Sequence, residues 1–128
     1  MNVVCAPSNR TFDLKVRTKE FALQVIKLFR TLPRSEEGRV IGKQILRSGT
    51  SIGANYRAAC RSRSKAEFIS KISIVLEEAD ETVFWLELLL QSEMSSKIRI
   101  EGMLAEANEL TSIFVSSLRT SKGLNGTL

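Results

Sequence analysis

Hydrophobic residues recur every three or four positions along most of this chain, which is the spacing of one face of an α-helix. Alternating β-branched runs of the kind that form strands are few. Proline occurs only at positions 7 and 33, so little interrupts the helical pattern. The pattern predicts an all-α protein, an antiparallel up-down-up-down four-helix bundle.

Serine caps and one proline divide this pattern into helices. The first helix should end before Pro33, because the residue before a proline disfavours helical geometry. The second is expected from about Glu36 to Arg61 and the fourth from about Lys97 to Leu118. The expected N-caps of the last three helices are Ser35, Ser64 and either Ser95 or Ser96. The expected apolar stripe of the first helix is Phe12, Val16, Phe21, Ala22, Val25, Leu28, Phe29 and Leu32.

A chain of 128 residues is long enough for one domain with a modest core. We expect the folded domain at residues 12–118, after a flexible N-terminus at 1–11. Residues 119–128, in a segment rich in Ser, Gly, Thr and Asn, are expected to form a flexible tail.

The second helix carries two adjacent strips that face inward. Its expected core face consists of Ile41, Ile45, Ile52, Tyr56 and Ala59. Beside it lies a strip of small residues, Gly42, Gly49, Gly53 and Cys60. Each glycine lowers the stability of a helix by about 0.8–1 kcal/mol relative to alanine, so the three glycines of this strip require a structural explanation. Close packing of another helix is the favoured interpretation, and a kink near Gly49 is the alternative.

The outer side of the second helix is basic. At 100° per residue, five cations fall within an arc of about 80° and form a stripe about 33 Å long. These cations are Arg39, Lys43, Arg47, Arg57 and Arg61. Residues 34–65 carry eight basic and two acidic side chains, whereas residues 66–92 carry one basic and six acidic ones. The stripe indicates phosphate contact, a solvated face, or ion pairs with the acidic third helix.

The third helix has two apolar sides and therefore needs two partners. One side, centred on Phe68, Ile72 and Val75, should enter the bundle core. The other could pack against a second subunit, unless the helix is buried on all sides within one chain. The residues expected at this subunit interface are Glu78, Glu81, Trp85, Leu88 and Leu89.

The composition argues against common catalytic and metal chemistry. The chain has no histidine, which removes the commonest general base and most catalytic metal sets. The acidic residues 77–81 fan around the helix, so we expect no metal and no cofactor. Cys5 and Cys60 show no metal-binding spacing and are expected to be reduced thiols. No signal peptide or membrane span is predicted, which favours a cytoplasmic protein.

One central run is distinctive beyond its helical period. Residues 42–61 read GKQILRSGTSIGANYRAACR, followed by SKAEF at 64–68, LEEADE at 76–81 and WLEL at 85–88. Together they resemble the four-helix bundle family of proteins encoded in intervening sequences of bacterial 23S ribosomal RNA genes, from about Phe12 to Leu118. The wider family includes the accessory protein of diversity-generating retroelements. Most of its members have Pro-Ser-Asn or a similar sequence where this chain has residues 53–55, and Glu-Gly where it has residues 58–59, so we carry over no retroelement partner.

The resemblance implies a small bacterial cytoplasmic protein that assembles into a ring-like homo-oligomer, typically a homopentamer. Together with the basic stripe, it leads us to expect a non-enzymatic protein that binds nucleic acid, RNA or DNA, largely independently of sequence. The expected phosphate contacts are Arg39, Lys43, Arg47, Arg57, Arg61, Arg63 and Lys65. The alternative is a protein-interaction or scaffold module whose stripe docks an acidic protein partner or a neighbouring subunit.

Overall fold

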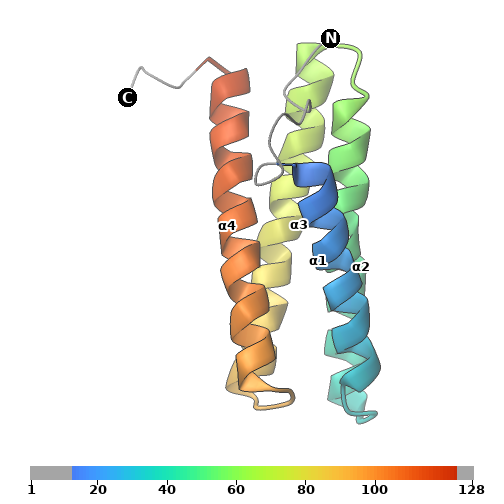
Figure 1. Ribbon diagram of the computed structural model, residues 1–128. Coiled ribbons are helices and arrows are strands. Elements are labelled where there is room, and N and C mark those ends of the chain that lie inside the picture. Colours follow the sequence, from blue (N-terminus) through green and yellow to red (C-terminus); the bar gives the residue numbers. More distant parts are fainter. Residues whose placement is uncertain (1–12, 124–128) are drawn as a thin grey trace.

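The computed structural model describes residues 13–123, and they form four helices. These are α1 (Leu14–Thr31), α2 (Glu36–Cys60), α3 (Lys65–Gln91) and α4 (Lys97–Ser121). Consecutive helices run antiparallel and lie side by side as an up-down-up-down bundle, in which α1 is the shortest (Figure 1). The predicted all-α, four-helix fold is confirmed.

The predicted caps are present at the helix starts. The Ser35 hydroxyl accepts a hydrogen bond from the Gly38 amide at 3.1 Å, and the Ser64 hydroxyl accepts one from the Glu67 amide at 3.0 Å. Ser96, rather than Ser95, caps α4 by accepting from the Arg99 amide. Each cap satisfies an amide that the helix itself leaves without a partner.

The end of α4 lies beyond the predicted boundary. The helix continues to Ser121, whereas we expected it to end near Leu118. Residues 119–121, which we assigned to the flexible tail, are therefore helical, because the first glycine after Leu118 is Gly123, just past the helix end. The expected flexible segment 1–11 and the last five residues lie outside the described part of the chain.

One apolar core runs through the bundle and receives side chains from all four helices. Its largest fully buried members are Phe21, Phe68, Phe114, Leu28, Ile45, Ile52, Ile72, Leu86, Leu89, Ile100, Leu110 and Val25. The stripe predicted on α1 is wrong at Val16, which is 41% exposed. Leu14 and Thr18 are buried instead, since Val16 lies about 200° around the helix from Leu14.

The glycines of α2 are the contact points for α1. A Cβ built on Gly49 would lie 2.7 Å from Cγ2 of Val25, and one on Gly53 would lie 3.2 Å from the Thr18 hydroxyl. A Cβ on Gly42 would meet Leu32 at 3.1 Å. These short distances confirm the close-packing interpretation, and α2 continues without a break through Gly49.

The first helix packs unevenly on its two neighbours. It approaches α2 far more closely than α4. On the α4 side, the Arg17 guanidinium contacts Glu106 at 2.7 Å and Glu109 at 2.8 Å. These carboxylates raise the pKa of Arg17, chiefly through the hydrogen bond from Arg17 to Glu106. The ion pair fastens one end of α1 to α4 and leaves a groove between the two helices.

The expectation for the cysteines is wrong at Cys60, which is disulfide-bonded in the structure. Pairing depends on which segments meet in space, and the separation of two cysteines along the sequence does not show this. Cys5 lies outside the described residues. Within residues 13–123, no helix is long and apolar enough to cross a membrane.

Candidate nucleic-acid interface

The structure divides the basic stripe of α2 into two parts. Arg47 lies about 80° around the helix from Arg39 and Arg57, at the edge of the stripe that faces α3. Its guanidinium contacts Glu78 at 3.1 Å and also pairs with Glu81. Of the alternatives for the stripe, ion pairing with the third helix therefore applies to Arg47, and the two carboxylates come from the same chain.

Glu81 is held as a carboxylate by two donors. The indole N–H of Trp85 donates to it at 3.0 Å, and Arg47 donates to the same oxygen. The Trp85 hydrogen bond and then the Arg47 hydrogen bond lower the pKa of Glu81. The hydrogen bonds to Glu81 and Glu78 in turn raise the pKa of Arg47. Among the described residues, the charge of Arg47 is therefore balanced by two carboxylates of α3, unlike those of the other cations of the stripe.

The fluorescence of Trp85, the single tryptophan, should report the ionisation of Glu81. A lowered pKa means that the stabilisation by the carboxylate is complete above the ordinary pKa and is lost as pH falls through the lowered one. We expect a fluorescence transition with its midpoint below 4.5. Glu81→Gln should abolish it, while Glu78→Gln, which leaves the Trp85 hydrogen bond intact, should keep it. A midpoint above 4.5 would contradict this assignment.

The other predicted contact residues remain exposed. They are Arg39, Lys43, Arg57, Arg61, Arg63 and Lys65. Within residues 13–123, the ion pairs of the structure are formed by Arg17 and Arg47, and none involves these six side chains. Their charges are therefore not balanced by a contacting carboxylate, and an external anion could approach them.

The first helix adds cations to this surface that the sequence reasoning did not assign. Lys15 and Lys19 lie beside Arg57 around a groove of about 190 Å³ between α1 and α2. A second hollow along the same pair of helices, of about 580 Å³, is lined by Arg30, Arg34 and Arg39. Neither lining includes a carboxylate. We define the α1–α2 basic face as eight exposed cations from α1, from the link between the two helices and from α2 with its C-cap: Lys15, Lys19, Arg30, Arg34, Arg39, Lys43, Arg57 and Arg61.

The predicted subunit interface on α3 is partly available at the surface. Trp85 and Leu88 are half-buried, and the Phe84 ring, which we did not predict, is 51% exposed. The Phe84 and Trp85 rings meet edge to face with centroids 5.0 Å apart. The expectation is wrong for Leu89, which has no exposed surface because it turns into the core. Phe84, Trp85 and Leu88 form an aromatic patch beside Glu81.

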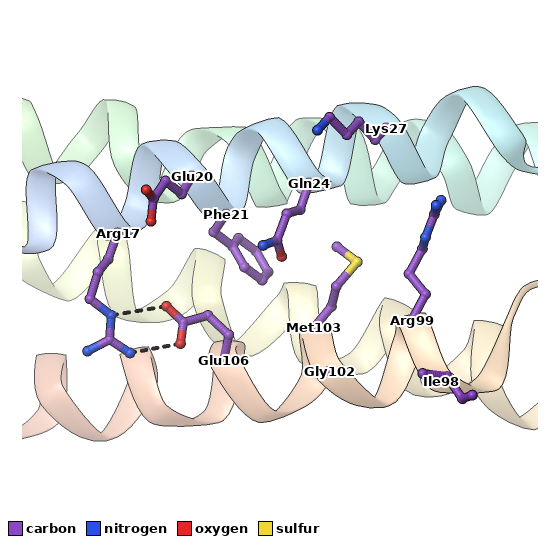
Figure 2. Close-up of a pocket in the computed structure, with 10 residues that line it drawn as sticks. All are labelled: Arg17, Glu20, Phe21, Gln24, Lys27, Ile98, Arg99, Gly102, Met103 and Glu106. Atoms are coloured by element: carbon purple, nitrogen blue, oxygen red, sulfur yellow. Dashed lines mark hydrogen bonds and ion pairs between the residues drawn. The ribbon is translucent and has the colours of Figure 1, made fainter. Parts of the chain in front are cut away.

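The α1–α4 groove has a different character. It has a volume of about 430 Å³, and Phe21 from α1 and Met103 from α4 point into the space between the helices (Figure 2). Its lining mixes cations with the carboxylates of Glu20 and Glu106. Because Arg17 at one end is already bound by Glu106 and Glu109, only Lys27 and Arg99 remain against the carboxylate of Glu20, and the excess of positive charge is small.

The described residues hold no group of three or more His, Cys, Asp or Glu side chains placed to bind a metal ion. The core hydroxyl of Tyr56 is also unsuited to acid–base exchange near neutral pH. Burial, and then the charge of Asp13, raise its pKa to about 12.

Comparisons with known proteins agree with this architecture. Residues 10–116 match the model of a family described as 23S rRNA-intervening sequence protein. A crystal structure of a protein of unknown function from the S23 ribosomal protein family of Bacteroides thetaiotaomicron is similar, with 40% sequence identity and a TM-score of 0.78. The similarity covers 83% of this chain and 98% of that one. No curated protein matches the sequence.

Proposed function

Because the chain belongs to the 23S rRNA-intervening sequence protein family, whose similar solved member is of unknown function, we propose a function from the surface itself. The protein is a non-enzymatic, homo-oligomeric nucleic-acid-binding protein that contacts phosphates through its α1–α2 basic face. Binding is largely independent of sequence, since phosphates position a strand and carry no base identity.

The observation that supports this proposal is the sorting of charge between neighbouring helices. The α1–α2 basic face carries eight exposed cations, and none of them forms an ion pair with a described carboxylate. Two acidic residues of α3, Glu78 and Glu81, are paired with Arg47 at the edge of the stripe. The exposed carboxylates of α1 and α2 themselves are Glu20, Glu36 and Glu37, so a polyanion approaching these helices meets more attraction than repulsion.

The aromatic patch supports self-association, and we propose a pentamer. An exposed phenylalanine beside a half-buried tryptophan is typical of the apolar centre of a subunit interface. A closed ring repeats the basic face once per subunit, so weak phosphate contacts would add up along one strand. The alternative is a scaffold module in which the same cations dock an acidic protein.

Direct binding tests the proposal. Nuclease-treated protein is titrated at low salt into labelled duplex DNA, single-stranded DNA and structured RNA, and the mass of the oligomer is measured in the same buffer. We expect the protein to bind more than one of these nucleic acids with similar affinity. The mass of the oligomer should be several times that of one chain. If the protein binds none of the three, nucleic-acid binding is refuted and an acidic protein partner is favoured.

A further inference from the structure

We infer that the small groove between Lys15, Lys19 and Arg57 is a binding site for a phosphodiester group of a nucleic-acid backbone, an inference that rests on the proposed function. Three cations from two helices surround the groove, and its lining contains no acidic side chain. Lys15 and Lys19 stand four residues apart on one side of α1, and Arg57 faces them from α2.

The floor of the groove lets an anion come close to both helices. It consists of Thr18, Ala22, Thr50 and Gly53, which are buried or half-buried, while the lining residue Ala54 is exposed. The helices meet closely here because Gly53 has no side chain. An added Cβ would lie 3.2 Å from the Thr18 hydroxyl. Because these residues are small, the three cations have the longest side chains around the groove. An oxyanion seated there can contact several of them at once.

The size of the groove selects the chemical group. Its volume of about 190 Å³ is below the roughly 300–1,000 Å³ typical of pockets that enclose whole small ligands. A phosphate group fits in this space, whereas a whole nucleotide would extend beyond it. The groove therefore suits one link of a continuous strand rather than a free nucleotide.

The hydroxyl groups of the floor are already used as donors. Thr18 donates to the Leu14 carbonyl at 2.6 Å, and Thr50 donates to the Leu46 carbonyl at 2.6 Å. Phosphate oxygens accept hydrogen bonds only, so Lys15, Lys19 and Arg57 must supply the donors. Two lysines four residues apart repel each other when the groove is empty, and a bound phosphate removes that repulsion.

The test compares two variants that lose the same charge. Lys15→Gln/Lys19→Gln removes two cations of the groove, and Lys97→Gln/Lys122→Gln removes two exposed lysines of the α4 ends. We expect the groove variant to bind nucleic acid at least tenfold more weakly. The slope of log affinity against log salt concentration should also become less steep, by about 0.7–0.9 for each lost phosphate contact. The control should change affinity less than threefold. Equal losses in both variants would overturn the groove site and leave the proposed function standing.

A second variant keeps the charge and fills the space. Ala54 is exposed on α2, so Ala54→Leu should fold normally while its side chain occupies the groove. We expect at least a tenfold loss of nucleic-acid affinity with an unchanged melting temperature; unchanged affinity would refute the site. Inorganic phosphate should compete only at concentrations far above those of oligonucleotide phosphate. Equal competition would assign the groove to the free anion. If the wild-type protein binds no nucleic acid, the proposed function itself fails.

Discussion

Gly49→Ala should lower the free energy of unfolding by about 2 kcal/mol, although alanine is the better helix former. The new Cβ would lie 2.7, 3.1 and 3.4 Å from three atoms of the Val25 side chain. Val25 is fully buried and, as a β-branched residue, has little freedom to turn away. We expect a packing cost of about 3 kcal/mol, which exceeds the gain of about 1 kcal/mol in helix propensity.

Gly102→Ala is the matched control for this prediction. Gly102 is exposed on α4, and a methyl group added there would have no neighbouring atom within 4 Å. The same substitution should therefore raise the free energy of unfolding by about 0.5–1 kcal/mol. Urea unfolding followed by circular dichroism, at one protein concentration for all variants, measures both changes. Stabilisation by Gly49→Ala would contradict the close packing of α1 on α2.

Arg39→Glu/Arg57→Glu should weaken nucleic-acid binding about 100-fold or more. Both residues lie on the α1–α2 basic face and form no ion pair with a described carboxylate. Each reversal removes an attraction and adds a repulsion, and a combined loss of about 3 kcal/mol corresponds to roughly two factors of ten. The fold should be unaffected, because both side chains are exposed. Fluorescence anisotropy with a labelled duplex measures the change.

Two comparison variants make this result specific. Arg99→Glu/Arg119→Glu alters the net charge equally but changes α4, so its effect on binding should be several-fold smaller. Arg47→Gln removes a charge that is already paired with Glu78 and Glu81. It should alter binding less than threefold and cost at most about 1 kcal/mol of stability, as expected for a largely exposed ion pair. Similar losses of binding in the two double variants, which change the net charge equally, would show that net charge, rather than the basic face, controls affinity.

The features that could be predicted from the sequence are local ones. Serine caps such as Ser35 and Ser64 act within one turn, and the glycine strip of α2 follows directly from helical periodicity. The resemblance of residues 42–61 to a known family added the connection between the helices. These signals sufficed for the bundle, its core and most helix boundaries.

The features that could not be predicted depend on how helices are rotated against one another. Leu89 lies only about 40° from Trp85 around α3, so a small rotation decides which of them enters the core. The ion-pair partners of Arg47 could not be predicted for the same reason, because the positions of Glu78 and Glu81 depend on how α3 packs against α2. Lys15 and Lys19 were not assigned to the candidate site because only the packing of α1 on α2 brings them beside Arg57.

The salt dependence of nucleic-acid binding tests the central claim most directly. Affinity for a labelled duplex would be measured across a series of salt concentrations, with the mass of the oligomer recorded in each buffer. Contact between the α1–α2 basic face and phosphates predicts a linear fall of log affinity with log salt, with a slope of about −0.9 for each phosphate contacted, while the oligomer persists. An affinity that does not change with salt, or no binding at low salt, would contradict the claim.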